Sequence, residues 1–281
     1  MKKQVSRREF VGMAAAATAW AASASAQPPS GKAAAVRERL RLGVASYSMR
    51  ELSLDQALEG AKTLGVTSMS FKDVHLPRTD PPETTRALAA KIRAAGITIA
   101  GGGTITLPNH PAQIKKDFEY AKQAGFPLIF ISPDPAALDT IEQMVKTYDI
   151  RVAIHNHGPE DKWWPRPQDA YAAIKSRDRR MGLCIDVGHT TRTGTNPAQA
   201  CRECRDRLYD MHVKDLKSME NHSDTEVGRG IINFPELFKA LLEIGYQGQV
   251  GLEYEINAKN PIAGMIESMA YLRGVLAALT T

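Results

Sequence analysis

The sequence predicts an α/β protein that folds as a single (β/α)8 barrel. From Leu40 to the C-terminus, eight short apolar or β-branched runs alternate with eight longer segments of helical period. Several helical segments stop at a glycine, and others begin at a proline. Removal of residues 1–26 would leave 255 of the 281 residues, close to the roughly 250 of one such barrel.

The strands are expected where short runs of buried-type residues recur, and the helices where apolar residues repeat every three or four positions. In chain order the expected strands are 40–46, 67–72, 98–102, 128–132, 151–157, 182–188, 209–214 and 249–255. The expected helices are 54–64, 82–95, 112–124, 136–148, 167–175, 197–207, 234–244 and 262–277. The glycines expected to end helices with a positive φ are Gly65, Gly96, Gly125 and Gly245.

An open, doubly wound sheet is the alternative architecture. It is disfavoured because no Gly-x-Gly-x-x-Gly follows the first strand, and Gly101-Gly102-Gly103 lacks that spacing. We interpret these three glycines as a place where a strand end comes close to substrate or to a neighbouring backbone.

The N-terminus resembles a twin-arginine signal peptide. Arg7-Arg8 precede an Ala-rich apolar stretch, and Ala24-Ser25-Ala26 forms a small-residue cleavage site before Gln27. A membrane anchor is the weaker interpretation, because it needs about 20 apolar residues and this run is shorter. We therefore expect a signal peptide over 1–26, a linker over 27–39 and the barrel over 40–281.

Export implies a periplasmic protein that contacts the twin-arginine translocase and keeps no stable membrane anchor after cleavage. The signal peptide carries +3 of the formal net charge of +5, so the mature chain gives no argument for binding nucleic acid or lipid. A homo-oligomer is compatible with the sequence. Cys184 fits a small core residue, whereas Cys201 and Cys204 fit packed thiols, a local disulfide or, less well, half of a zinc site.

Four late strands each place a metal-capable side chain near the end of an apolar run. Parallel strands point their carboxyl ends at one face of a barrel, so these residues should converge. Strand alternation puts Val152 and Ile154 outside and His155 inside, and the same rule turns the other candidates inward. The predicted metal ligands are His155, Asp186, His212 and Glu253, with His157 as the alternative to His155.

Two imidazoles and two carboxylates suit one divalent transition metal better than Mg²⁺, which prefers oxygen ligands. We expect Mn²⁺ first, with Zn²⁺, Co²⁺ or Fe²⁺ as alternatives. Each residue alone could instead bond a neighbouring backbone. That interpretation weakens when four such residues fall at strand ends on one face.

At these residues the chain resembles the xylose isomerase-like TIM barrels, the sugar phosphate isomerase/epimerase superfamily that includes inosose dehydratase, ketose 3-epimerases, 3-keto-glycoside lyases and endonuclease IV. The most specific parts of the resemblance are the Asp-x-Gly-His at Asp186, the His-x-Lys-Asp at His212 and the Gly-x-Gly at Gly228. The resemblance implies a Glu, an Asp, a His and a second Glu as metal ligands. His155 stands where the first glutamate is expected, which puts two-base epimerisation in doubt.

The resemblance further implies that His189 contacts substrate beside the metal. Asn156 and His157 could supply hydrogen bonds to the ligands or to substrate. Glu253 is the expected base, and Lys72 and Lys214 are candidate proton carriers or partners for a negative oxygen, with a salt bridge at the barrel mouth as the alternative for each. The remaining candidates for binding substrate are His75 and Arg229, which are expected in loops on the same face, and Trp163-Trp164. The two tryptophans could form a stacking surface for a sugar ring, or they could simply cover the barrel edge.

The chemistry expected is proton abstraction next to a carbonyl, with a metal stabilising the enediolate. Export and the lack of a Gly-rich phosphate cradle favour an unphosphorylated sugar or keto-sugar. The leading hypothesis is an isomerase or epimerase. The alternatives are a lyase or dehydratase that eliminates a β-substituent and a non-catalytic sugar-binding barrel, while phosphodiester hydrolysis lacks the ligands and the basic groove.

Overall fold

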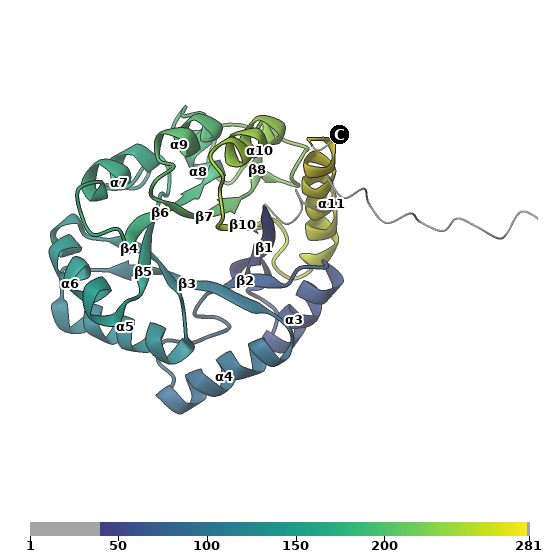
Figure 1. Ribbon diagram of the computed structural model, residues 1–281. Helices are drawn as coiled ribbons and strands as arrows, with labels where there is room; N and C mark the ends of the chain where they lie inside the picture. The colour runs from purple at the N-terminus through teal and green to yellow at the C-terminus, as the bar shows by residue number, and fades with distance from the viewer. Residues whose placement is uncertain (1–39, 280–281) are drawn as a thin grey trace, which may run out of the picture. The chain divides into compact units, whose positions relative to one another are not determined.

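The computed structural model describes residues 40–279, and these form a closed barrel of eight parallel strands, which confirms the predicted fold. Figure 1 shows the strands as a ring enclosed by helices. Around the barrel the order is β1 (Arg41–Ala45), β10 (Gln249–Leu252), β7 (Leu208–Val213), β6 (Met181–Asp186), β5 (Arg151–His155), β4 (Leu128–Pro133), β3 (Thr98–Leu107) and β2 (Ser68–Phe71).

Eight helices cover the outside of this barrel. They are α3 (Leu54–Thr63), α4 (Pro82–Ala94), α5 (Pro111–Ala124), α6 (Leu138–Tyr148), α7 (Pro167–Ile174), α9 (Pro197–Glu203), α10 (Phe234–Glu243) and α11 (Ile262–Ala278). Short 3-10 turns, η1 (Ser46–Met49) and η2 (Pro135–Ala137), follow β1 and β4. The four glycines expected after helices all adopt φ between 62° and 80°, as predicted.

The core has two layers, which follow from strand alternation. Outward residues such as Val152, Ile154 and Met211 join the large apolar cluster between barrel and helices. Inside the barrel a small separate cluster of Leu128, Phe130, Ala153 and Cys184 fills the middle. Larger polar side chains occupy the interior above and below this plug.

Several predicted boundaries were wrong. The strand expected over 182–188 ends at Asp186, because that residue caps a short helix, α8 (Val187–Arg192). The strand expected over 151–157 ends at His155, so alternation does not position His157. The third strand extends to Leu107, the helix expected over 197–207 ends at Glu203, and an antiparallel pair, β8 (Asp215–Leu216) with β9 (Asp224–Thr225), was not predicted.

The three consecutive glycines allow β3 to lie very close to β4. A Cβ on Gly101 would lie 2.6 Å from the Leu128 carbonyl oxygen, and one on Gly102 would lie 1.9 Å from the Phe126 ring. This bears out the interpretation of a close backbone approach. Cys184, Cys201 and Cys204 are free, buried thiols.

The predicted signal peptide and linker lie outside the described residues. Within residues 40–279, none of the helices combines the length and the apolar character that crossing a bilayer requires.

Candidate metal centre

Four strands bring the predicted metal ligands together inside the C-terminal end of the barrel. His155 ends β5, Asp186 ends β6, His212 lies in β7 and Glu253 directly follows β10. All four side chains are buried, and one ligand atom from each lies within 4.8 Å of the others. The alternative ligand, His157, is not part of this cluster.

The ligand atoms face a common point. His155 Nε2 lies 3.0 Å from His212 Nδ1 and 3.8 Å from Asp186 Oδ2, and His212 Nδ1 lies 3.3 Å from Glu253 Oε2. Two nitrogen and two oxygen donors at these separations match adjacent positions around a metal, where bonds of about 2.1 Å at right angles separate ligand atoms by about 3 Å. Asp186 Oδ2 is buried and makes no hydrogen bond among the described residues, although it forms an ion pair with the Lys214 ammonium 3.2 Å away. The residues present therefore fit a divalent transition metal.

Lys214 completes the cluster from the residue after β7. Its ammonium lies 3.2 Å from Asp186 Oδ2 and 3.0 Å from Glu253 Oε2, and it also bonds Glu255. The side chain is only 5% exposed. Although burial disfavours the ammonium, the three carboxylates raise the pKa of Lys214 well above its usual value.

The electrostatics of the other groups follow from burial and from these neighbours. Burial, with His157 and His212 nearby, lowers the pKa of His155 well below its usual value and leaves a neutral imidazole. Burial and then Lys214 lower the pKa of His189 to about 3. His155 thus has the neutral form in which histidine binds metals, whereas His212, although buried, has a pKa well above its usual value because Cys184 and Glu253 lie beside it.

The Asp-x-Gly-His motif has a clear structural reason. Asp186 Oδ1 accepts a hydrogen bond from the His189 amide (2.8 Å) and so caps α8, which leaves Oδ2 for the cluster. A Cβ on Gly188 would lie 2.6 Å from Lys214 Cγ, so glycine lets the lysine pass. Asn156, the residue after β5, fixes the position of Asp186, because its Oδ1 accepts from the Asp186 amide (3.0 Å) and its Nδ2 donates to Thr190 (3.1 Å).

The other two motifs meet at Asp215. Its buried carboxylate accepts four backbone N–H groups, those of Leu216, Gly228, Gly230 and Ile232, at 2.9 to 3.2 Å. A Cβ on Gly230 would lie 2.2 Å from Asp215 Oδ1. The Gly-x-Gly segment is therefore fastened to the end of β7, next to Lys214.

Two further histidines stand at the edge of the cluster. The His157 and His189 ring centres lie 4.6 Å and 6.1 Å from that of His155, and 5.8 Å from each other. His157 Nδ1 pairs with Asp161 Oδ2 at 3.1 Å. Both rings are partly exposed, so they can present polar atoms to a molecule at the barrel mouth.

The remaining predicted site residues make their contacts with residues outside this cluster. The Lys72 ammonium lies 4.7 Å from the Tyr47 ring centre, and His75 is buried with Nε2 3.0 Å from the Leu52 carbonyl oxygen. Arg229 is exposed and pairs with Glu267 of α11. Trp163 is 38% exposed under the Lys162 ammonium, whereas Trp164 is buried and donates to the Pro133 carbonyl.

Sequence reasoning missed Arg192, a buried cation at the edge of the site. Its guanidinium lies 3.4 Å from His189 Nδ1 and bonds Glu160. The available signal was its position three residues after His189, which places both on one helix face.

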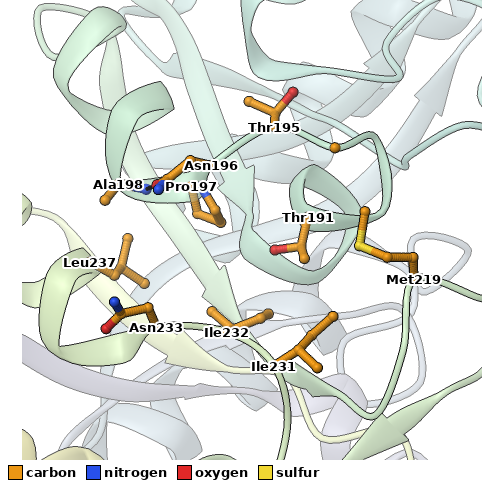
Figure 2. A pocket seen from close by; sticks show the side chains of 11 residues that line it. Thr191, Thr195, Asn196, Pro197, Ala198, Met219, Ile231, Ile232, Asn233 and Leu237 are labelled. Carbon is orange, nitrogen blue, oxygen red and sulfur yellow. Dashed lines mark hydrogen bonds between the residues drawn. The ribbon is translucent and has the colours of Figure 1, made fainter.

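A separate hollow lies between the starts of α9 and α10. Figure 2 shows Pro197 and Ala198 on one side and Asn233 and Leu237 on another, with Met219, Ile231 and Thr191 nearby. Its lining includes none of the predicted site residues.

Comparisons with known proteins agree with this architecture. The family model described as "Xylose isomerase-like TIM barrel" matches residues 58–275. An L-ribulose 3-epimerase structure superposes with a TM-score of 0.70 at 16% identity, covering 85% of this chain and 95% of that one. The 3-keto-D-glucoside 4-epimerase of E. coli gives a TM-score of 0.68 at 19% identity, covering 84% and 99%. At these identities the structures show the fold alone.

Curated relatives are enzymes that modify carbohydrates. Inosose dehydratase of Clostridium botulinum is 23% identical over 154 residues, which are 48% of this chain and 51% of that protein. The 3-dehydro-D-guloside 4-epimerase of Escherichia coli is 35% identical over 106 residues, 37% of this chain and 38% of that protein. The chain thus spans about half the length, or less, of these relatives.

Proposed function

Since this chain belongs to the xylose isomerase-like TIM barrel family, we propose that it is a divalent-metal-dependent enzyme that removes a proton next to a carbonyl of an unphosphorylated keto-sugar. The observation that carries the proposal is the buried cluster of His155, Asp186, His212 and Glu253 at the C-terminal end of the barrel. That end is where barrel enzymes place their chemistry. The names of the relatives support a carbohydrate substrate.

His155, Asp186, His212 and Glu253 would hold the metal, with Mn²⁺ our first choice. When bound, a divalent ion polarises a carbonyl and offsets the negative charge that develops as the neighbouring proton leaves. Glu253 is the base that would take this proton, because its carboxylate faces the centre of the cluster. Lys214, 3.0 Å from Glu253 Oε2, would hold that carboxylate in place and donate a hydrogen bond to an oxygen of the substrate.

The residues at the mouth would bind the rest of the sugar. His157 and His189 can exchange hydrogen bonds with hydroxyl groups, and Trp163 offers an exposed ring on the same side. Return of the proton to the opposite face of the same carbon gives an epimer, and its return to the neighbouring carbon gives an isomer.

Elimination is the second candidate reaction, and the imidazole of His155 favours it. An epimerase with two glutamates has a base on each face of the substrate, whereas here the first position holds a neutral imidazole with a low pKa. Elimination needs one base and one acid. Glu253 would take the proton, the electron pair would form the carbon–carbon double bond, and Glu253 would then pass the proton to the leaving oxygen, so that one carboxyl group acts first as base and then as acid.

Turnover in D₂O distinguishes the reactions. The metal-loaded protein is incubated with keto-sugars and with a 3-keto-glycoside, and the products are followed by NMR. Deuterium in a recovered sugar or its epimer supports isomerisation or epimerisation, and an enone with released aglycone supports elimination. Glu253→Gln should abolish both, whereas Glu119→Gln, a carboxylate on the exposed face of α5, should have no effect. Neither exchange nor product with Mn²⁺, Zn²⁺, Co²⁺ or Fe²⁺ would refute the proposal.

We further propose that the enzyme acts in the periplasm, on the strength of the N-terminal Arg7-Arg8 and the small-residue site ending at Ala26. Cell fractionation of the full chain should place the mature protein, beginning at Gln27, outside the cytoplasm. Replacing both arginines by lysine should retain the precursor inside. A precursor that is exported equally well after this change would contradict the assignment.

A further inference from the structure

A second cavity lies at the opposite end of the barrel from the metal centre. It measures about 480 Å³, within the usual range for small-molecule sites, and is lined by residues from the N-terminal ends of β1, β3, β4, β5, β7 and β10. The apolar plug of Leu128, Phe130, Ala153 and Cys184 fills the barrel interior between this cavity and the metal cluster. The two places are therefore separate sites.

Two buried polar atoms of residues that line this cavity have no hydrogen-bond partner among the described residues. Asp210 and Gln249 are each 2% exposed, and Asp210 Oδ1 and Gln249 Nε2 make no hydrogen bond there. The Gln249 side chain is fixed at its other atom, because Ser68 Oγ donates to Gln249 Oε1 at 2.6 Å. A buried polar atom left without a hydrogen bond costs about 1 to 3 kcal/mol. The wall of the cavity thus holds one acceptor and one donor without a hydrogen bond among the described residues.

Two arginines flank the same cavity. Arg41 begins β1 and Arg151 begins β5, which lie opposite each other in the ring of eight strands. Strand alternation places both arginines on the inner face of the barrel, since the neighbouring Leu42 and Val152 pack outward. Both are exposed, and neither has a carboxylate within ion-pair distance among the described residues, although Arg151 lies 5.3 Å from the Tyr209 ring centre. Four of the seven other exposed arginines among the described residues pair with an acid, as Arg179 does with Asp206.

We propose that this cavity, the lower site, binds a small hydroxylated monocarboxylate. The carboxylate would lie between Arg41 and Arg151, a hydroxyl would donate to Asp210 Oδ1, and an oxygen would accept from Gln249 Nε2. A neutral sugar would offer no negative charge to the two guanidinium groups. Burial raises the pKa of Asp210 to about 7, so near neutral pH its carboxyl group is charged in only part of the molecules; in that form it repels a phosphate dianion more strongly than a monoanion. The inference does not depend on the reaction at the metal centre.

Calorimetric titration with D-gluconate tests the lower site. The mature protein is treated with EDTA and dialysed, so that gluconate cannot chelate a metal at the other end of the barrel. We expect saturable binding with one site per chain. Acetate, which lacks hydroxyls, and D-glucose, which lacks the carboxylate, should each bind at least 10-fold more weakly. No saturable binding of gluconate, or equal affinity for acetate, would overturn the proposal.

Variants then locate the binding. Arg41→Ala with Arg151→Ala removes two exposed side chains and should weaken gluconate binding at least 10-fold without loss of fold. Arg86→Ala with Arg205→Ala removes the same charge from exposed positions elsewhere and should bind like the parent. Asp186→Asn should also bind normally. Binding that survives the first pair but is lost in Asp186→Asn would assign gluconate to the metal centre and refute the lower site.

Discussion

At the residue scale, the candidate metal centre contains one cation among three acids. Lys214 contacts the carboxylates of Asp186, Glu253 and Glu255, and its side chain is almost completely buried. Removing one partner from a buried ionic group leaves the remaining charges without compensation. The lysine is therefore important to the fold as well as to the proposed chemistry.

We expect Lys214→Met to lower the unfolding free energy of the metal-free protein by about 3 kcal/mol, because three carboxylates lose their cation. Excess Mn²⁺ should reduce this loss, since a divalent ion replaces the missing charge. Urea denaturation with and without metal measures both effects. Lys146→Met, which breaks an exposed pair with Glu142, is the control and should cost about 0.5 kcal/mol or less. A loss in Lys214→Met no larger than in the control would contradict this view.

A second prediction at the residue scale concerns His75 and the pH dependence of the unfolding free energy. Burial lowers its pKa below the usual 6.5, and its ring contacts the Leu52 carbonyl. The unfolded chain then binds the proton more readily than the folded one, so stability is complete above pH 6.5 and is lost as the pH falls below it.

In His75→Gln this dependence should weaken, because glutamine does not titrate. The difference in unfolding free energy between parent and variant should be larger at pH 7.5 than at pH 5.5, by up to about 1.4 kcal/mol per pH unit in the affected range. Asn221→Gln, an exposed side chain that does not titrate, should show the same difference from the parent at both pH values. A constant difference for His75→Gln would show that its proton equilibrium does not contribute to stability.

At the scale of the element, glycines have opposite roles in β3 and α11. Gly102 has no room for a methyl group, because a Cβ would lie 1.9 Å from the Phe126 ring. Gly274 lies on the exposed side of α11, and nothing lies within 4 Å of the position its Cβ would take.

The same substitution should therefore have opposite effects. Gly102→Ala should destabilise the protein by about 1 to 3 kcal/mol through overpacking. Gly274→Ala should stabilise it by about 0.5 to 1 kcal/mol, because alanine restricts the unfolded chain and favours a helix. Thermal and urea unfolding of the two variants measure both, and changes of the same sign would contradict the argument.

Element boundaries were predictable where local chemistry decides them. The glycines after α3, α4, α5 and α10 marked the helix ends because only a left-handed residue closes those turns. The end of β6 was mispredicted because the Asp186 side chain, not a glycine or proline, starts α8. A cap that is also a candidate metal ligand looks, in the sequence, like the continuation of a strand.

At the scale of the whole molecule, the barrel and the convergence of the four candidate ligands were predictable from the sequence, because strand number and alternation fix which residues share the interior. The contacts of the other candidate site residues could not be predicted from the sequence. Arg229 pairs with Glu267 and Lys72 lies against Tyr47, contacts that depend on how loops close over the barrel rather than on any period in the chain. The proposed lower site could likewise not be predicted from the sequence, since Arg41 and Arg151 are 110 residues apart.

Metal binding should appear as a change in the stability of the whole domain. At a concentration 100 times its dissociation constant, a ligand adds about 2.7 kcal/mol to the unfolding free energy. For a domain of this size that corresponds to a rise in Tm of about 5 to 10 °C. Differential scanning calorimetry should show this rise with Mn²⁺ for the parent and for Asp206→Asn, an exposed acid, but not for Asp186→Asn. An equal rise in Asp186→Asn would place the metal elsewhere.

The four hydrogen bonds to Asp215 also bear on how new specificities could be built on this barrel. Because the segment from Gly228 to Ile232 shares one buried carboxylate, exchanging it for a foreign sequence would strand a charge in the interior. The tip of the β5–α7 connection, at Lys162 and Trp163, carries exposed side chains instead. Loop grafting should therefore begin there, on the side of the mouth where sequence can vary without disturbing the scaffold.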